Sequence, residues 1–244
     1  MPTTKLKIMT YNVQWFSGVN SQLEMQQRIM DKYNPQIIGL QELSTTGWIN
    51  SVGRKTLAGY ENQYVSKHKN YLGIASIYAL KNVRSYDFKH QDPEDMARYG
   101  ETRAYMTGTL EIDGKRIKII NTHLSYLTQS VKYQQMKEIF NSAEKAEYAV
   151  ILGDFNCFYG ENERRFGRFE EAGYHIANCG PTPKKTWTDK PNPKWLSRMT
   201  YPTDNIIVSP NITIKKVMFD RVKLKYPTGD PMDHIAVIAR LHIK

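Results

Sequence analysis

The segment AVILGDFN (149–156) constrains the fold of this chain more than any other part of the sequence. Ala149 to Leu152 form an uninterrupted apolar run, which predicts a strand that is buried on both faces. A carboxylate, Asp154, and a carboxamide, Asn156, follow this run. In an extended chain, residues two positions apart point to the same side. We therefore expect a core strand that delivers two polar side chains into one pocket.

Length, cysteine content and charge limit the possible classes of protein. A chain of 244 residues fits one large domain or two small ones, and it buries a sizeable core without disulfides. It has two cysteines and no CxxC or Cys/His cluster typical of zinc sites. Lys and Arg total 34 against 24 Asp and Glu, a net charge of +10. This excess favours an anionic partner such as nucleic acid, although a solvated basic surface also explains it.

The sequence predicts a soluble cytoplasmic protein. The first 13 residues lack the apolar run and the small-residue cleavage site of a secretory signal. No apolar stretch approaches the roughly 20 residues that a membrane span requires. The low cysteine content suits a reducing compartment. Nothing in the sequence requires more than a monomer.

Hydrophobic spacing predicts more strands than helices. Helical spacing marks residues 22–33 and 131–146, and a short helix is expected within 161–177. Strands are expected at 5–13, 37–42, 71–79, 103–110, 115–122, 149–152, 205–210, 212–219 and 235–243. Residues 180–203 have the composition of a loop. No repeat or linker divides the chain, so we expect one domain over 1–244, with sheet packed on sheet and helices outside.

Polar residues of a few chemical types lie next to these predicted strands. They are Asn12, Glu42, His123, Asp154, Asn156, Asp204, Asp233 and His234. Because loops at strand ends bring distant residues together, the set predicts a common site. Oxygen ligands suit Mg²⁺ or Mn²⁺, and histidines beside carboxylates transfer protons or neutralise a phosphate.

Each of these residues also fits a purely structural role. The structural alternatives are turns (Asn12, Asp204), a cap (Glu42), a core histidine (His123), an Asx turn (Asp154, Asn156) and a strand entry (Asp233, His234). For several residues taken singly, a structural role explains the sequence as well as a functional role does. The order and spacing of the whole set favour a site.

The same segments resemble the endonuclease/exonuclease/phosphatase superfamily, the group that contains DNase I. The matching segments are TYNV (10–13), PQIIGLQE (35–42), NTHL (121–124), GDFN (153–156), TDNIIVS (203–209) and MDHIAV (232–237). They follow the family's order, span nearly the whole chain, and are most similar to those of small bacterial Mg²⁺-dependent hydrolases. The resemblance implies a DNase I-like α/β fold, a four-layer α/β/β/α sandwich of two mixed sheets with helices outside. It also implies metal-dependent hydrolysis of a phosphate ester.

The resemblance also implies a role for each residue on the metal side of the site. Glu42 would be the main Mg²⁺ ligand, with Asn12 close by and Asp233 as a further ligand. Asp154 would orient or deprotonate the attacking water, and Asn156 would help to hold that water and the phosphate.

On the phosphate side, the resemblance implies two histidines with separate partners. His234 would contact the scissile phosphate and would be oriented by Asp204. His123 would stabilise the charged phosphate or assist the leaving group. Glu101 resembles the carboxylate that orients this second histidine, and Arg103 would bind substrate phosphate.

Two positions depart from the pattern of particular branches. Abasic-site nucleases of this family carry an aspartate where this chain has Gln14, and a tyrosine-containing segment in place of NTHL. This difference disfavours an exonuclease III-like repair role. Asn205 occupies a position that is usually aromatic, which affects packing more than chemistry.

The leading expectation is a Mg²⁺- or Mn²⁺-dependent phosphodiesterase, a nuclease acting on DNA or RNA. The basic charge balance supports it, as do four aromatic residues able to stack on bases or simply to pack: Phe158, Tyr159, Trp187 and Trp195. The alternative is a phosphatase or phospholipase C-type hydrolase of a phospholipid, an inositol phosphate or another small phosphoester. The absence of an evident amphipathic helix weighs against lipid. A third possibility is a catalytically silent nucleic-acid-binding domain.

Overall fold

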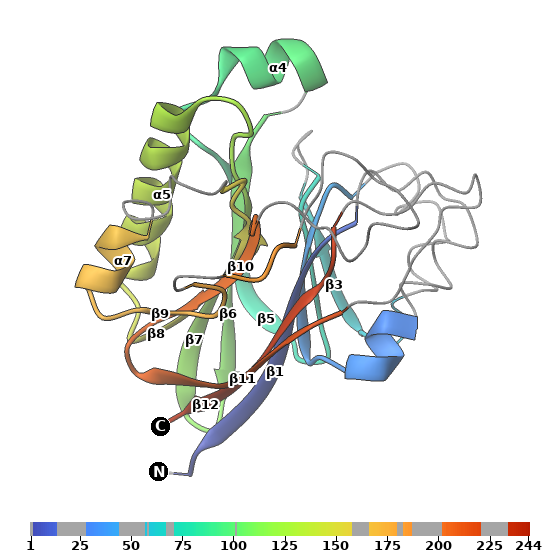
Figure 1. Cartoon of the computed structure of the whole chain (residues 1–244). Coiled ribbons are helices and arrows are strands. Elements are labelled where there is room, and N and C mark those ends of the chain that lie inside the picture. The colour runs from blue at the N-terminus through green and yellow to red at the C-terminus, as the bar shows by residue number, and fades with distance from the viewer. Residues whose placement is uncertain are drawn as a thin grey trace.

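The fold consists of two β-sheets packed face to face, with helices on the outer faces (Figure 1). The computed structural model describes residues 2–13, 28–43, 57, 59–66, 71–100, 102–157, 166–179, 183–186, 202–220 and 234–244. Helical residues 28–33 cover one sheet, and helices α5 (Gln129–Ala143) and α7 (Gly167–Glu171) cover the other. The predicted four-layer α/β/β/α sandwich is therefore confirmed.

The first sheet contains both the earliest and the latest strand of the chain. Within the described residues its order is β11-β12-β1-β2-β4-β3. The strands are β1 (Thr4–Asn12), β2 (Ile37–Gln41), β3 (Asn62–Val65), β4 (Gly73–Ser76), β11 (Ile212–Phe219) and β12 (Val237–Ile243). Strand β1 runs parallel to β2 and antiparallel to β12. The sheet is therefore mixed.

The second sheet has the order β5-β6-β7-β8-β10-β9 in the described part of the chain. Its strands are β5 (Leu80–Asp87), β6 (Ala104–Ile112), β7 (Lys115–His123), β8 (Tyr148–Asp154), β9 (His175–Ile176) and β10 (Asp204–Val208). Strand β8 is parallel to β7 and antiparallel to β10. The β6–β7 hairpin turns at Asp113 and Gly114, whose φ values of 50° and 73° suit a tight Asp-Gly turn.

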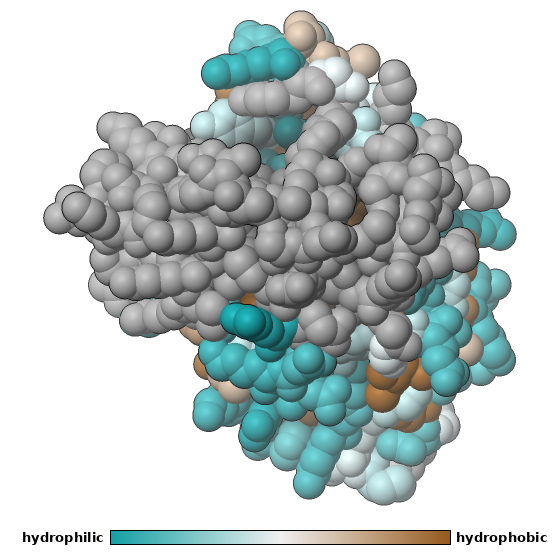
Figure 2. Space-filling view, turned by 90° about the vertical axis from the view of Figure 1, so that its right-hand side faces the viewer, coloured by the Kyte–Doolittle hydropathy of each residue, from teal (hydrophilic) through white to brown (hydrophobic). Residues whose placement is uncertain are grey.

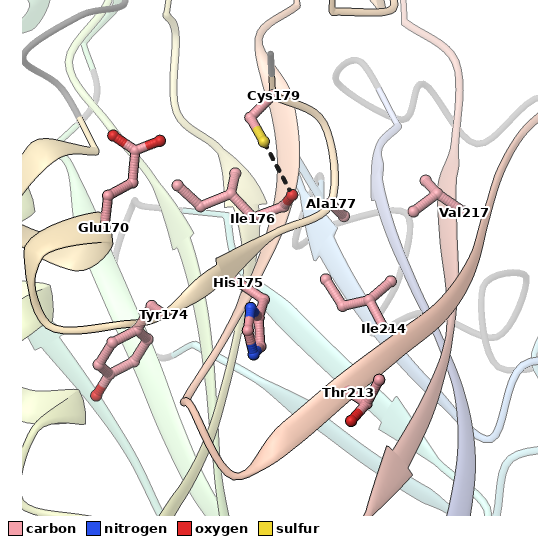
Figure 3. A pocket seen from close by; sticks show the side chains of 9 residues that line it. All are labelled: Glu170, Tyr174, His175, Ile176, Ala177, Cys179, Thr213, Ile214 and Val217. Carbon is pink, nitrogen blue, oxygen red and sulfur yellow. Dashed lines mark hydrogen bonds between the residues drawn. The ribbon is translucent and has the colours of Figure 1, made fainter.

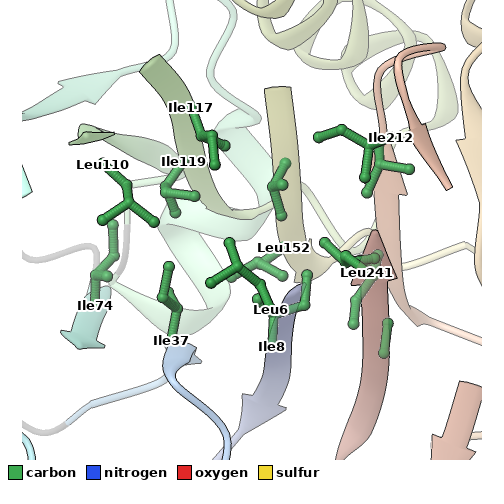
Figure 4. Close-up of a cluster of buried hydrophobic side chains, with 14 of the residues drawn as sticks. Leu6, Ile8, Ile37, Ile74, Leu110, Ile117, Ile119, Leu152, Ile212 and Leu241 are labelled. Carbon is green, nitrogen blue, oxygen red and sulfur yellow. The ribbon is translucent and has the colours of Figure 1, made fainter. Parts of the chain in front are cut away.

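The main core lies between the two sheets (Figure 4). Leu6 and Ile8 of β1 pack there against Ile119 and Leu152 of the second sheet, and none of the four is more than 2% exposed. Strand β8 is buried on both faces, as its apolar run predicts. Val150 and Leu152 join the core between the sheets, whereas Ala149 and Ile151 pack on the helix side.

Four elements were missed by the sequence prediction: β3, β5, β9 and α4 (Pro93–Tyr99). Strand β5 is largely exposed, so it lacks the apolar pattern of a buried strand. Helix α4 is too short for periodicity to show. Its ends are marked instead by Asp92, which accepts a hydrogen bond from the Glu94 amide at 3.0 Å, and by Gly100 in the left-handed region.

Several predictions fall partly outside the described residues. The helix predicted over 22–33 is described only from residue 28, and the loop predicted over 180–203 only at 183–186 and 202–203. The aromatic residues expected to stack on bases also lie outside. Among the helices that the structure describes, none combines the length and the apolar run needed to cross a membrane.

Gly153 marks a close approach of β8 to β7. A Cβ added there would lie 2.6 Å from the backbone carbonyl oxygen of Thr122, which cannot rotate away. We expect Gly153→Ala to lower the free energy of unfolding by about 1–3 kcal/mol, measured by urea denaturation. The control is Gly167→Ala, where an added Cβ meets nothing within 4 Å. Equal stability of the two variants would contradict this interpretation.

Candidate active site

The polar residues singled out in the sequence meet at one edge of the sandwich. Asn12, His123 and Asp154 end β1, β7 and β8, while Asp204 begins β10 and His234 precedes β12. Strands β10 and β12 run antiparallel to their neighbours, so their beginnings lie where the other strands end. In Figure 1 this edge lies away from the two chain ends, which are both at the bottom.

Asp154 lies at the centre of this group. Its register neighbours are His123 on β7 and Asp204 on β10. Asp154 is 1% exposed, and its Oδ2 lies 3.6 Å from His234 Nε2 and 3.7 Å from His123 Nε2. Burial alone would raise the pKa of Asp154, but the neighbouring imidazoles, His234 first and then His123, and a hydrogen bond from Asn12 hold it below its ordinary value. Asp154 is therefore an ionised carboxylate facing an imidazole on each side.

His234 and Asp204 form a buried pair. His234 Nδ1 lies 2.9 Å from Asp204 Oδ2, which also accepts a hydrogen bond from Thr203 Oγ1 at 3.0 Å. Burial raises the pKa of Asp204, and the adjacent His234 offsets only part of that effect. The second oxygen, Asp204 Oδ1, is buried and has no hydrogen-bond partner among the described residues. The pair fixes the imidazole ring so that Nε2 faces Asp154.

His123 has a different partner. Arg103 Nη1 lies 2.9 Å and 3.0 Å from the two ring nitrogens of His123, and Arg103 is 5% exposed. Burial and then the charge of Arg103 lower the pKa of His123 well below its ordinary value, which favours the neutral form of the ring. Glu101, which was expected to orient His123, lies outside the described residues. The structure places Arg103, expected at the substrate phosphate, against His123.

The candidate metal ligands lie on the first-sheet side of the site. Asn12 Nδ2 donates to Glu42 Oε1 at 2.9 Å and to Asp154 Oδ2 at 3.0 Å, so two carboxylates converge on one donor. Glu42 has φ of 56°, a left-handed value that is uncommon outside glycine and often found at functional sites. Asp233 lies outside the described residues.

These converging oxygens fit Mg²⁺ or Mn²⁺, both of which prefer oxygen ligands. A second group could also hold an ion: ligand atoms of Asp154, Asp204 and His234 lie within 4.8 Å of one another. Asp154 belongs to both groups. Asp154 would therefore contact both a bound ion and the two histidines.

Asn156 combines the two roles that its sequence left open. Its backbone amide donates to Asp154 Oδ1 at 2.8 Å, which forms the Asx turn. Its side-chain Nδ2 donates to the carbonyl of Leu124, directly after His123, at 2.8 Å. Lys132 of α5 donates from its buried ammonium to the Asn156 carbonyl at 3.1 Å. The sequence prediction missed this lysine, although a lysine on the apolar face of a predicted helix was a usable signal.

A buried polar bridge behind the site joins the two sheets. Gln41 Nε2 donates to Asn121 Oδ1 at 2.6 Å and to Thr10 Oγ1 at 3.1 Å. Asn121 Nδ2 donates to two carbonyl groups of the first sheet. Gln41 and Asn121 stand in the segments that resemble the family, next to Glu42 and close to His123, but their contact was not predicted. The bridge sets the separation between the metal side and the histidine side.

Helix α4 supports the histidine side through a buried ion pair that the sequence prediction also missed. Asp95 is fully buried, and its carboxylate lies 3.3 Å from Arg103 Nε. The same carboxylate accepts hydrogen bonds from the amides of Tyr126 at 2.8 Å and Leu127 at 3.3 Å. Asp95 therefore ties Arg103 to the loop that follows His123.

Replacing Asp95 by Asn should destabilise the fold, because it removes the buried counter-charge of Arg103. We expect Asp95→Asn to lower the free energy of unfolding by about 3 kcal/mol, measured by urea denaturation. The exposed neighbour Glu94 provides the control, and Glu94→Gln should change stability by less than about 0.5 kcal/mol. A loss for Asp95→Asn no greater than that of the control would show that the pair contributes nothing.

A separate hollow lies at another edge of the sandwich, between β9 and β11 (Figure 3). Its volume is about 370 Å³. It is lined by Glu170, Tyr174, His175, Ile176, Ala177, Cys179, Thr213, Ile214 and Val217. None of the candidate site residues is among them. The hollow is therefore not part of the candidate active site.

Solved structures share this fold along nearly their whole length. An endonuclease/exonuclease/phosphatase family protein from Bacteroides thetaiotaomicron has a TM-score of 0.76 and 14% identity, covering 100% of this chain and 99% of that one. A mannosyl-6-phosphatase from the same species has a TM-score of 0.76 and 14% identity, covering 97% and 99%. TDP2 from D. rerio, in complex with a single-strand DNA product, has a TM-score of 0.71 and 18% identity, covering 98% and 99%.

The sequence comparisons give two results. Comparison with curated proteins gives no match. The family model described as "Endonuclease/Exonuclease/phosphatase family" matches residues 9–225, which is most of the chain and includes every described candidate residue except His234. The chain therefore belongs to the endonuclease/exonuclease/phosphatase family.

Proposed function

We propose that the chain is a divalent-metal-dependent phosphodiesterase that cleaves DNA or RNA. The observation that carries the proposal is the position of Asp154, buried between two imidazoles and sharing the amide of Asn12 with Glu42. Family membership supports hydrolysis of a phosphate ester. The net charge of +10 supports a polyanionic substrate, and the D. rerio TDP2 structure holds single-strand DNA.

Glu42 and Asn12, together with Asp233, would hold Mg²⁺ or Mn²⁺, which supplies positive charge to the phosphate oxygens when bound. Asp154 would orient the attacking water or accept its proton, because its carboxylate is ionised and lies between the two imidazoles. Asn156 closes the turn that holds the Asp154 carboxylate in place.

The two histidines take different parts in the proposed reaction. Asp204 holds His234 through Nδ1, which leaves Nε2 to donate a hydrogen bond to a phosphate oxygen. The lowered pKa of His123 beside Arg103 favours the neutral ring, which acts as a hydrogen-bonding group. Arg103 adds a positive charge close to the phosphate side of the site.

A second candidate is a phosphatase acting on a small phosphoester. The similarity in fold to the mannosyl-6-phosphatase favours it, and the same residues would serve the same roles. A phospholipase C-type activity uses this chemistry too. A catalytically silent binding domain is disfavoured because Glu42, Asp154 and His234 are all present.

We also propose that residues 1–244 form one domain. Strand β1 lies near one end of the sequence and β12 near the other, yet they are neighbours in the first sheet, with seven residue pairs in register from Thr4↔Ile243 to Thr10↔Val237. We also propose a cytoplasmic location, on the low cysteine content of the sequence.

The test is hydrolysis of a substrate panel in the presence of Mg²⁺, Mn²⁺ or EDTA. The panel contains single- and double-stranded DNA, RNA, bis-p-nitrophenyl phosphate, sphingomyelin, an inositol polyphosphate and mannose 6-phosphate, with Asp154→Asn as the inactive control. Metal-dependent cleavage of nucleic acid that the control lacks is the expected result. Cleavage of only a small or lipid phosphoester would overturn the substrate and keep the chemistry. Binding of nucleic acid without cleavage of any substrate would favour the silent domain.

A further inference from the structure

Among the residues that the structure describes, one part of the outer face of the first sheet carries only cations and neutral polar groups. These positions lie on three adjacent strands, β11, β12 and β1. The basic residues are Lys5, Lys7, Lys215, Lys216, Arg240 and His242, and we call them the cationic face. All are exposed or partly exposed. Lys5 and Lys7 alternate with the buried Leu6 and Ile8, so they point away from the core.

The strand register places these cations directly side by side. Arg240 has Lys7 as its register partner on one side and Lys216 on the other. His242 pairs in the same way with Lys5. Neighbouring strands are about 4.8 Å apart, and like charges directly opposite each other destabilise a sheet. Partial desolvation and then the charges of Lys215 and Lys5 lower the pKa of His242, as expected where positive charges gather.

The rest of the described chain does not neutralise this charge. None of the six residues forms an ion pair with a carboxylate among the residues that the structure covers, whereas Lys32 pairs with Asp220 and Lys81 with Glu111. Lys7 donates to the carbonyl of Tyr33. The sheet therefore carries an unfavourable arrangement that an anionic partner would relieve.

The cationic face has a sharp boundary toward the candidate active site. Beyond Lys7 and Arg240 the same face becomes apolar at Met9 and Ile238, which belong to the cluster that includes helical residue Ile29. Figure 2 views the molecule from this side, and its lower part, where the strands approach the chain ends, is mostly hydrophilic. Within the described residues, the large exposed hydrophobic side chains lie on other elements: Ile77, Tyr86, Met96 and Tyr133. The face therefore lacks the apolar side chains that anchor a protein in a membrane surface.

The cationic face and the candidate site lie at different ends of the same strand. Lys7 precedes Asn12 by five residues on β1, a distance of about 17 Å in an extended chain. A small phosphoester cannot reach both places, whereas a polymer with repeated phosphates can. The six residues include no Phe, Tyr or Trp for stacking on bases, so contacts would be mainly to backbone phosphates and largely independent of sequence.

We propose that the cationic face is a second docking surface for the phosphodiester backbone of a nucleic acid, outside the active site. The identity of the polymer rests on the proposed function, but the binding itself is measured without catalysis. Docking there would hold a long substrate while its scissile phosphate occupies the site at the end of β1. It also selects long nucleic acids over short ones.

The test compares two variants that each lose three positive charges. One is Lys5→Thr/Lys216→Thr/Arg240→Thr, in which threonine suits an exposed strand. The control is Lys89→Gln/Lys137→Gln/Lys145→Gln, three exposed lysines on and around α5, on the other side of the sandwich. Binding of a fluorescent DNA duplex of about 20 base pairs is measured in EDTA, between about 50 and 200 mM salt.

The cationic-face variant should bind the duplex at least about tenfold more weakly at the lowest salt concentration. Its slope of log K against log salt should be shallower by about 2 to 3, because each lost phosphate contact removes about 0.9. The control should keep the parent slope. The proposal would be overturned if the two variants had the same salt slope, or if their affinities for the duplex fell by the same factor. In either case only the net charge of the protein would matter.

Two further measurements separate the remaining outcomes. If the cationic-face variant lost binding to phosphatidylserine vesicles but bound DNA as the parent does, the proposal would be overturned in favour of a membrane-binding surface. The cationic-face variant should hydrolyse bis-p-nitrophenyl phosphate at the parent rate, because none of its changes lies in the candidate site. Absence of hydrolysis in the parent itself would refute the proposed catalytic function, whereas the DNA slopes would still decide whether the face binds nucleic acid.

Discussion

Glu42→Gln is expected to abolish metal-dependent hydrolysis while the fold survives. Glu42 is partly exposed at the end of β2, and its carboxylate shares the Asn12 amide with Asp154. Glutamine keeps the size of the side chain and one oxygen acceptor, but it removes the negative charge that a divalent cation requires. We expect kcat/KM to fall by roughly a thousandfold, about 4 kcal/mol of transition-state stabilisation.

The measurement is kcat/KM on the best substrate of the panel across a Mg²⁺ titration, together with calorimetric binding of Mn²⁺ in the absence of substrate. The variant should bind Mn²⁺ more weakly and keep the parent melting temperature. The control is Glu61→Gln, at an exposed glutamate next to β3 in the same sheet. Parent-like turnover and metal binding by Glu42→Gln would refute the role of Glu42 as the main ligand.

His234→Ala should have the second large effect, and it should act on kcat. His234 Nε2 faces Asp154 at 3.6 Å, and Nδ1 is held by Asp204 at 2.9 Å, so the ring is fixed before substrate binds. A donor placed in this way acts mainly on the charge that develops in the transition state. We expect kcat to fall by about 10²–10⁴, with a smaller change in KM.

Two comparisons make this prediction specific. Asp204→Asn should also lower kcat, but less than His234→Ala, because it loosens the ring without removing it. His175→Gln, at an exposed histidine of β9 outside the site, should leave kcat unchanged. A loss below about tenfold for His234→Ala, about 1.4 kcal/mol, would rule out a direct part in the chemistry.

Parts of the fold follow from short-range patterns in the sequence. The apolar run at 149–152 predicts a strand buried on both faces, and β8 is such a strand. The turn at Asp113 and Gly114 predicts the β6–β7 hairpin, because these residues tolerate the left-handed conformations that a tight turn requires. Strand β5 could not be found in this way, since its side chains are mostly exposed and carry no apolar signal.

The membership of the candidate site was also open to prediction. A carboxylate at the end of a core strand, as at Asp154, is costly to bury unless other groups pair with it or donate hydrogen bonds to it. Its position in the sequence therefore predicts polar partners nearby. The parallel pairing of β1 with β2 and of β7 with β8 then brings such strand ends together. Asp233 and Glu101 remain predictions.

The contacts within the candidate site depend on packing between segments that are far apart in the sequence. His123 lies against Arg103 as well as Asp154, and Arg103 is held in turn by Asp95 of a helix that the sequence did not reveal. The hydrogen bond between Gln41 and Asn121 joins residues that are 80 positions apart and lie in different sheets.

The physical reason is the range over which each preference acts. Strand and turn preferences arise within a few residues, so the sequence predicted most of the strands, the β6–β7 hairpin and the polar residues placed at strand ends. Contacts such as Arg103 with His123 depend on the register of β6 against β7 and on how α4 packs beside them. These long-range choices are made by burial and packing of the whole sandwich, and local patterns carry no information about them.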